Sequence, residues 1–155
     1  MLDIGAGTGA ITAPLLRAGA RVIAVEAHRG RAAQLRARFG DDVVVVQADA
    51  AELRLPRKPY FVVANPPFSV SAPLLRRLLQ PGSRLIGGRL VLQDQVARRW
   101  ARGDAPGSKR WSSDFTVSTG RKVPRHAFRP RPRVDTRVLA IDRRSAGGRR
   151  PSGLA

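Results

Sequence analysis

The sequence contains no cysteine, and this absence excludes both a disulfide framework and a metal site built from thiolates. Histidine is almost as rare, since His28 and His126 are the only two and lie in unrelated contexts. A metal-dependent hydrolase is therefore not expected. No apolar run approaches the roughly 20 residues that a membrane-spanning helix needs, and no signal peptide precedes the first expected strand. We expect a cytoplasmic protein that binds neither a metal nor a membrane.

Acidic residues are also scarce, and the imbalance is concentrated in one half of the chain. There are 11 acidic and 29 basic residues, for a net charge of +18. Residues 1–80 hold 11 basic and 6 acidic residues, a net of +5, whereas residues 81–155 hold 18 and 5, a net of +13. A GC-rich genome explains the preference for arginine over lysine, but it does not explain the net charge. The second half therefore favours contact with a nucleic acid.

The 155 residues are enough for one domain with a hydrophobic core. Short apolar runs alternate with helical patterns, which is typical of βαβ units and a parallel sheet. Strands are expected near residues 2–4, 22–25, 43–46, 60–64, 89–92, 115–123 and 134–141. Helices are expected near residues 10–17, 30–39, 72–79 and 93–102, and a loop over 103–111. We predict an α/β fold: a mostly parallel seven-stranded sheet with helices on both faces and an antiparallel edge hairpin, whose strands are joined by a proline-rich connector over 128–133.

A glycine-rich turn follows the first expected strand. Gly5, Gly7 and Gly9 lie between a strand and a helix, where the missing Cβ atoms let the backbone approach a ligand closely. The signal leaves the ligand open, because Gly5, Gly7 and Ala10 also satisfy the looser dinucleotide fingerprint G-x-G-x-x-A. A tight turn that binds nothing is a weaker alternative, since three glycines cluster at the end of one strand.

Two carboxylates follow the next two strands. Glu26 can accept both hydroxyls of a ribose, although a surface acid beside Arg29 or Arg31 is the alternative. Asp49 can accept the exocyclic amine of an adenine, although a helix N-cap is the alternative. In the context of the glycine turn we favour ligand binding for both carboxylates, and Asp49 favours a methyltransferase over a nicotinamide enzyme.

The sequence Asn65-Pro66-Pro67-Phe68 follows the fourth expected strand and is the most specific signal. The N6 amine of adenine is a poor nucleophile because its lone pair is delocalised into the ring. An amide oxygen and a backbone carbonyl that accept its two N–H groups would free that lone pair for attack on a methyl group. The prolines fix the backbone, and the phenyl ring offers a stacking face for a base removed from its helix. A proline turn with a core aromatic residue explains this combination less well.

Together these features resemble the ribosomal RNA adenine N6-methyltransferases, which include the macrolide-resistance Erm enzymes and the housekeeping small-subunit dimethyltransferases. The similarity covers about residues 1–144. It is carried by Asp3–Gly9, Glu26, Asp49, Asn65–Phe68, Leu90–Gln93, Val96–Arg99 and Phe128–Leu139. The last stretch argues for RNA rather than DNA, and residues 120–128 look most like the actinobacterial Erm type.

The resemblance implies a class I, Rossmann-like methyltransferase that uses S-adenosylmethionine and acts on an adenine of large-subunit ribosomal RNA, and we expect it to be a monomer. It implies cofactor contacts at Asp3, Gly5, Ala6, Gly7, Glu26, Asp49, Ala50 and Asn65. It implies that Asn65, Pro66 and Phe68 hold the target base. The candidates for RNA contact are Arg98, Arg99, Arg121, Lys122, Arg125, Arg129 and Arg131.

Three departures from the family pattern lead to further expectations. The family's segment before the first strand and its helical C-terminal domain are missing, and Phe68 replaces the commoner tyrosine. We therefore expect an N-terminally truncated catalytic domain over residues 1–144 and a disordered basic tail over 145–155. The alternatives are a small-subunit dimethyladenosine transferase and an inactive RNA-binding remnant, with a nicotinamide oxidoreductase far behind.

Overall fold

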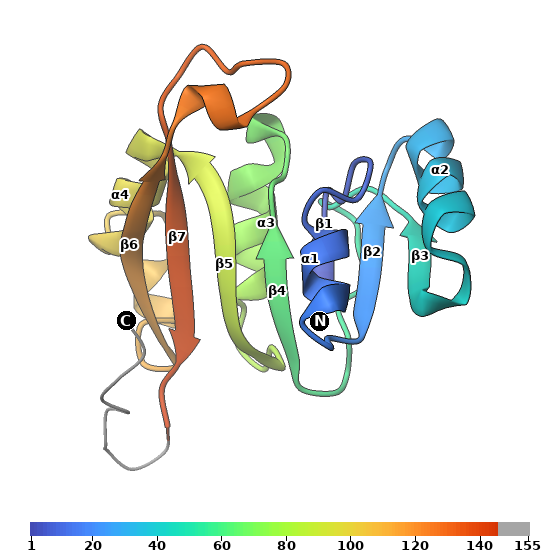
Figure 1. The fold of residues 1–155 in the computed structure, drawn as a ribbon. Coiled ribbons are helices and arrows are strands. Elements are labelled where there is room, and N and C mark those ends of the chain that lie inside the picture. The colour runs from blue at the N-terminus through green and yellow to red at the C-terminus, as the bar shows by residue number, and fades with distance from the viewer. Residues whose placement is uncertain (146–155) are drawn as a thin grey trace.

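Seven strands form one sheet in the order β3-β2-β1-β4-β5-β7-β6, in a computed structural model that describes residues 1–145. The strands are β1 (Leu2–Ile4), β2 (Val22–Glu26), β3 (Val43–Gln47), β4 (Tyr60–Ala64), β5 (Leu85–Gln93), β6 (Phe115–Val123) and β7 (Thr136–Arg143). The pairs among β1 to β5 are parallel, whereas β7 runs antiparallel to both β5 and β6. The predicted mostly parallel sheet with an antiparallel edge hairpin is confirmed (Figure 1).

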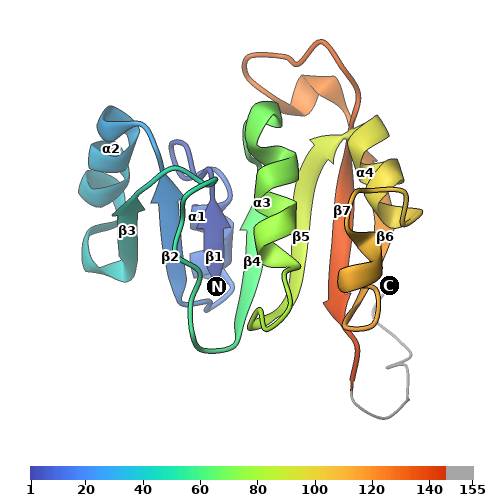
Figure 2. The ribbon, with the colours of Figure 1, turned by 180° about the vertical axis from the view of Figure 1, so that it is seen from behind.

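Helices cover both faces of the sheet, as expected. They are α1 (Thr12–Arg17), α2 (Arg29–Phe39), α3 (Ser71–Leu78) and α4 (Asp94–Ala101), with short 3-10 turns η1 (Gly40–Asp42), η2 (Phe68–Val70), η3 (Ser108–Arg110) and η4 (Arg125–Ala127). Figures 1 and 2 show α3 and α4 on one face and α1 on the other. None of the helices within residues 1–145 is long and apolar enough to cross a membrane. Of the tail expected to be disordered, only Ser145 lies among the described residues.

The larger hydrophobic core lies between the sheet and helices α3 and α4. Leucines of α3 and β5, among them Leu74, Leu78 and Leu90, are fully buried there. The segment after α4, expected to be an irregular loop, also contributes to this core. Its Trp111 stacks on Trp100 with ring centroids 5.9 Å apart, so the two indoles hold the segment against the helix.

The strand boundaries differ most from expectation at β5, which begins at Leu85 rather than near residue 89. Gly87 and Gly88 lowered the strand signal, because glycine weakens a strand interior. The structure shows why they are there. A Cβ atom at Gly87 would lie 2.5 Å from the ring of Phe61, and one at Gly88 would lie 2.4 Å from a methyl group of Val62. Close packing against β4 therefore requires both glycines.

Asp94, the first residue of α4, joins the helix to β7. Its Oδ1 accepts a hydrogen bond from Arg137 Nε at 2.6 Å, and its Oδ2 accepts one from Arg98 Nε at 2.7 Å. These two arginines lower the pKa of Asp94 from 3.8 to about 2. Because the folded pKa is depressed, the carboxylate stabilises the fold above the unfolded pKa, and that stabilisation is lost as the pH falls towards 2.

Asp94→Asn is therefore expected to lower the free energy of unfolding at pH 7, by an amount that shrinks as the pH falls from about 4 towards 2. Urea unfolding followed by tryptophan fluorescence at several pH values measures the difference. Asp142→Asn is the control, because its pair with Arg89 is exposed on both sides and is expected to contribute little. A difference between wild type and Asp94→Asn that stays constant with pH would contradict this assignment.

Candidate functional site

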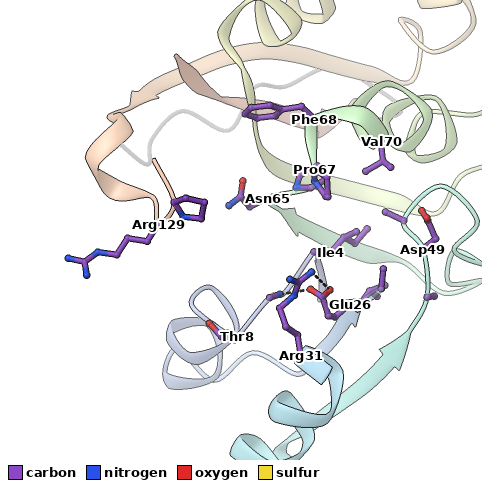
Figure 3. A pocket seen from close by; sticks show the side chains of 18 residues that line it. Ile4, Thr8, Glu26, Arg31, Asp49, Asn65, Pro67, Phe68, Val70 and Arg129 are labelled. Atoms are coloured by element: carbon purple, nitrogen blue, oxygen red, sulfur yellow. Dashed lines mark hydrogen bonds and ion pairs between the residues drawn. The ribbon is translucent and has the colours of Figure 1, made fainter. Parts of the chain in front are cut away.

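A cavity of about 660 Å³ lies at the carboxyl ends of β1, β2, β3 and β4 (Figure 3). Parallel sheets place ligands at this edge, beyond the strand ends and near the point where the strand order reverses. The reversal lies between β1 and β4, which are neighbours in space but not in sequence. The residues that line the cavity include Ile4, Gly5, Gly7, Glu26, Asp49, Ala50, Asn65, Pro66, Phe68 and Arg129. Most residues expected to form a site are thus brought together by the fold.

The glycine turn closes one wall of the cavity. The N–H groups of Gly5 and Ala6 both donate to the carbonyl of Val25, at 2.9 and 3.1 Å, which holds the turn against β2. Gly5 has a φ of +75°, and a Cβ atom there would lie 3.0 Å from the carbonyl oxygen of Asn65. Only glycine adopts this conformation without strain, so Gly5 lets the turn after β1 touch the turn after β4.

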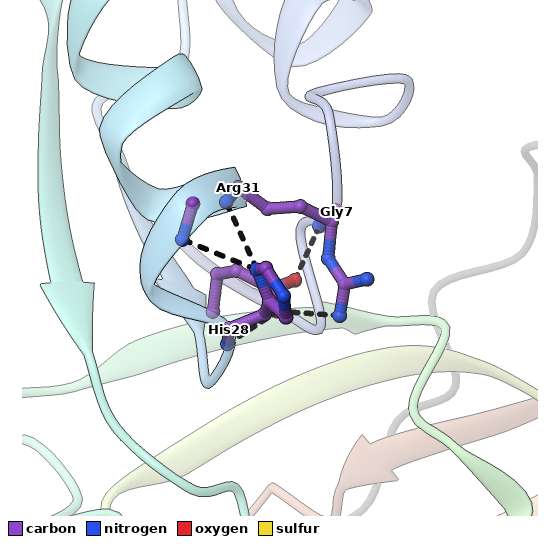
Figure 4. Close-up of polar contacts among 5 residues, drawn as sticks. Gly7, His28 and Arg31 are labelled. Carbon is purple, nitrogen blue, oxygen red and sulfur yellow. Dashed lines mark hydrogen bonds and ion pairs between the residues drawn. The ribbon is translucent and has the colours of Figure 1, made fainter.

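Glu26 lies at the end of β2 and is almost fully buried. Its Oε2 accepts a hydrogen bond from the N–H of Gly7 at 2.9 Å. Its Oε1 accepts one from the N–H of His28 at 2.8 Å and one from Arg31 Nη2 at 2.9 Å (Figure 4). Burial raises the pKa of Glu26, but the bonds from His28, Arg31 and Gly7 outweigh it, and the pKa lies below its ordinary value. Glu26 is therefore a fixed, ionised acceptor.

His28 and Arg31 were not expected to be site residues, except that Arg31 was weighed as a surface partner of Glu26. His28 caps α2, since its Nδ1 accepts from the N–H groups of Gly30 and Arg31 at 3.1 and 3.3 Å. Histidine is outside the usual set of capping residues, so this role could not be predicted from the residue type. Arg31 both lines the cavity and binds Glu26. Glu26 is therefore at once a residue of the cavity and the partner of an arginine, which the sequence analysis had treated as alternatives.

Asp49 and Ala50 follow β3 and line another wall. The Oδ1 of Asp49 accepts a hydrogen bond from the N–H of Ala51 at 2.8 Å. Residues 50–52 form a turn and no helix begins there, so the alternative of a helix N-cap is wrong. Within residues 1–145 no group donates to its Oδ2, so one acceptor oxygen stays available to a ligand. Asp49 thus stabilises its turn through Oδ1 and can still accept a hydrogen bond from a ligand through Oδ2.

The turn Asn65–Phe68 closes the cavity opposite Glu26 (Figure 3). The N–H of Asn65 donates to the carbonyl of Ile4 at 3.3 Å, which ties this turn to β1. Pro66 is buried, whereas Asn65 is exposed and the Phe68 side chain is 38% exposed. A polar amide and an accessible aromatic ring are therefore presented side by side at the cavity, on a backbone fixed by two prolines.

Asp3 and Ala6 are placed beside the cavity rather than in its lining. Asp3 is fully buried beneath the glycine turn, where its Oδ2 accepts a 2.6 Å hydrogen bond from the hydroxyl of Thr12. Burial raises the pKa of Asp3, and the bond from Thr12 opposes this only in part. Its Oδ1 has no partner within residues 1–145. In the structure the Asp3 side chain joins β1 to the first residue of α1.

The seven arginine and lysine residues expected to contact RNA are all exposed, but only one lines the cavity. That residue is Arg129, which reaches it together with Pro130 from the connector between β6 and β7. Arg98 and Arg125 are paired with Asp94 and Asp135, at 2.7 and 2.8 Å. The others are Arg99, whose Nε donates to a backbone carbonyl, and the exposed Arg121, Lys122 and Arg131.

Residues 121–133 concentrate this charge, with six arginine or lysine side chains and no acidic residue. Figures 1 and 2 show the connector arching above the ends of β5 and β7, on the same edge of the sheet as the cavity. Within residues 1–145 no three His, Asp or Glu side chains are grouped to hold a metal. The chemistry available here is that of fixed acceptors, an aromatic platform and a basic rim.

Comparison with known proteins places this geometry in context. Residues 1–147 match the family model described as ribosomal RNA adenine dimethylase. The rRNA adenine N-6-methyltransferase of Corynebacterium diphtheriae is 38% identical over 146 residues, which cover 92% of this chain and 57% of that relative. The ribosomal RNA small subunit methyltransferase A of Anaeromyxobacter dehalogenans is 34% identical over 165 residues, covering 90% of this chain and 56% of that relative. The chain thus spans little more than half the length of these curated relatives.

Among solved structures, the 23S rRNA methyltransferase ErmE superposes with a TM-score of 0.83 at 25% identity. The superposition covers 93% of this chain and 61% of that one. The predicted class I methyltransferase fold is thereby confirmed.

Proposed function

Because the chain belongs to the ribosomal RNA adenine dimethylase family, we propose that it transfers a methyl group to the N6 atom of an adenine in ribosomal RNA. The observation that carries the proposal is the contact between two turns. The glycine turn after β1 and the Asn65–Phe68 turn after β4 face one cavity and meet at Gly5. A methyl donor held by the first turn and an adenine held by the second would therefore be neighbours.

S-adenosylmethionine is the donor that we propose, since its methyl group is carried on a positively charged sulfur and is open to attack by an amine. The cavity fits it in three respects. Gly5 and Gly7 line the cavity without side chains, so the backbone of the glycine turn can approach a ligand closely. Glu26 is ionised, and its Oε2 accepts only one hydrogen bond within residues 1–145, so it can accept a ribose hydroxyl as well. Asp49 Oδ2 can accept the exocyclic amine of the adenine ring.

Asn65 and its neighbours prepare the acceptor. The side-chain oxygen of Asn65 and a backbone carbonyl of the turn would each accept one N–H of the target amine. The carbonyl of Pro67 is already used by the N–H of Val70 and, more weakly, by Ser71 Oγ. The carbonyl that receives the amine would therefore belong to Asn65 or Pro66. Two such bonds localise the nitrogen lone pair and aim it at the methyl group.

The proton balance requires no catalytic base. The N6 nitrogen would form its new bond to carbon as the methyl group left the donor's sulfur, and the nitrogen would briefly carry a positive charge. It would then lose one of its protons to water. Phe68, exposed at the cavity, would stack on the unpaired base, a contact worth about 1–3 kcal/mol.

Large-subunit RNA is the substrate that we favour, on the likeness to ErmE and on the Erm-like residues 120–128. The basic residues 121–133, at the end of β6 and in the connector, are the RNA surface in this proposal, and phosphate contacts there would make binding strongly dependent on salt. Such an enzyme would act in the cytoplasm, where ribosomes are made.

The test offers labelled S-adenosylmethionine and two RNA transcripts to the purified protein. One transcript is the peptidyl-transferase hairpin of the large subunit, and the other is the 3′-terminal hairpin of the small subunit. We expect label on the first. Label on the second alone would make this a small-subunit enzyme, as the similarity to the Anaeromyxobacter relative allows. Label on neither, with RNA still bound, would leave an RNA-binding protein without methyltransferase activity.

Glu26→Gln is expected to weaken S-adenosylmethionine binding by about 10- to 150-fold, because hydrogen bonds to a charged group contribute about 1.5–3 kcal/mol. The N–H₂ group of the glutamine would also face one of the three donors that now bond to Glu26, so that hydrogen bond would be lost. Isothermal titration calorimetry measures the effect. Glu52→Gln, an exposed carboxylate outside the cavity, should bind as the wild type does. An unchanged dissociation constant for Glu26→Gln would refute the ribose role.

A further inference from the structure

A second cavity lies on the same edge of the sheet, and the methyl-transfer chemistry does not use it. It has a volume of about 300 Å³ and begins at Gln93, the last residue of β5. Because β5 pairs directly with β4, Gln93 lies one strand over from the strand that leads to Asn65. This volume is at the low end of the range for small-ligand sites and suits a group no larger than one nucleotide.

One segment forms walls of both cavities. The connector between β6 and β7 contributes Arg129 and Pro130 to the first cavity, and it contributes Arg125 and residues 133–135 to the second. Both cavities therefore border the same loop. An RNA strand that lies along this loop would pass both cavities.

The second cavity is lined by charged side chains that form ion pairs and by polar side chains that make no hydrogen bond within residues 1–145. Asp94 is held by Arg98 and Arg137, and Arg125 is paired with Asp135 at 2.8 Å. These ion pairs stiffen the walls and neutralise the carboxylates. They leave the cavity's binding capacity to the other lining residues.

Those residues are Gln93, Gln95, Arg133 and Val134. Within residues 1–145 neither glutamine side chain and no guanidinium nitrogen of Arg133 makes a hydrogen bond to the protein. A glutamine amide offers a donor and an acceptor together, which is the pattern needed to read the edge of a base. Arg133 is exposed and suits a phosphate, and Val134, 40% exposed, offers an apolar surface to a ring.

We infer that this second cavity binds an unpaired nucleotide that neighbours the target adenine in the same RNA strand. Gln95 and Gln93 would read its base, Arg133 would contact its phosphate, and Val134 would contact the ring. The inference rests on the proposed function, because it takes the first cavity as the place of the target adenine. It adds a site that selects sequence next to the site that performs the reaction.

The experiment measures kcat/KM for methylation of the hairpin that the wild type labels, and of hairpins in which each nucleotide near the target is changed in turn. Three variants are compared with the wild type: Gln95→Ala, Arg133→Ala and, as a matched control, Gln34→Ala, an exposed amide on α2 outside both cavities. Gln95 is exposed near the start of its helix, so its truncation should not disturb folding. The affinity for S-adenosylmethionine is measured in parallel and should be unchanged in all three.

We expect the wild type to discriminate about 5- to 150-fold at one neighbouring position, the range for one well-placed amide–base pair. Gln95→Ala should lose most of that discrimination while methylating the same adenine. Arg133→Ala should weaken all hairpins alike, and Gln34→Ala should change nothing. Methylation with undiminished discrimination in Gln95→Ala would overturn the inference and leave the proposed function standing. No methylation of any hairpin by the wild type would overturn both.

Discussion

Replacing Asn65 with alanine is expected to lower the rate of methyl transfer by about 10²- to 10³-fold, which is the usual cost of removing one aligned polar group from a transition state. Asn65 is exposed at the end of β4 and lines the larger cavity. Its side-chain oxygen is the acceptor that we assign to the target amine. Single-turnover kinetics with saturating RNA and labelled S-adenosylmethionine measures the rate of the chemical step.

The affinity for RNA provides the control for this substitution. Because the basic rim over residues 121–133 is untouched, RNA binding by Asn65→Ala should stay within about twofold of the wild type. Gln34→Ala again serves as the matched amide outside the cavity. A rate that falls less than about tenfold would show that Asn65 does not hold the reacting nitrogen.

Gly5→Ala is expected to reduce methyl transfer by about tenfold or more and also to destabilise the fold. Alanine at a φ of +75° costs roughly 1–2 kcal/mol. In addition, its Cβ would press on the carbonyl of Asn65 at 3.0 Å, and the neighbouring atoms are backbone. The Asn65 turn would have to move, and displacements of about 1 Å at a reacting group can cost 10²-fold in rate.

Gly19→Ala separates these two effects. Gly19 has a φ of +80°, nearly that of Gly5, but a Cβ there would meet no atom within 4 Å. It should therefore lose about the same stability in urea unfolding and keep its full rate of methyl transfer. Equal rates in the two alanine variants would mean that the contact between the turns is unimportant for the reaction.

The order and type of the main elements could be predicted from the sequence because βαβ units repeat a local pattern. The strand at 60–64 was predicted to the residue, since an apolar run there ends at a proline turn. The site residues at strand ends were predictable for the same reason: the carboxyl ends of parallel strands share one edge. Gly87 and Gly88 misled the prediction of β5, because their cause is a neighbouring strand that is distant in sequence.

The position of the connector over the sheet could not be predicted in this way. Residues 124–135 have no apolar periodicity, so nothing in the sequence indicates where the loop lies over the sheet. Its role in two cavities depends on the register of β6 and β7, which is a tertiary property. The same holds for Arg31, whose guanidinium lies 2.9 Å from the Glu26 carboxylate only once β2 and α2 are folded together. Local sequence patterns predict where strands end, but they do not predict which loops and side chains pack over those strand ends.

The two ends of the connector between β6 and β7 are held together, so the loop can be exchanged as a unit in an engineered protein. Val123 and Thr136 at its two ends are register partners in the hairpin of β6 and β7, and the hydroxyl of Thr136 donates to the carbonyl of Val123 at 3.0 Å. This closed base fixes the two ends of the loop, so a loop of different sequence and equal span can be grafted between the same two residues. Such chimeras would carry a foreign substrate preference while keeping the donor-site residues at the strand ends, Gly5, Glu26 and Asp49.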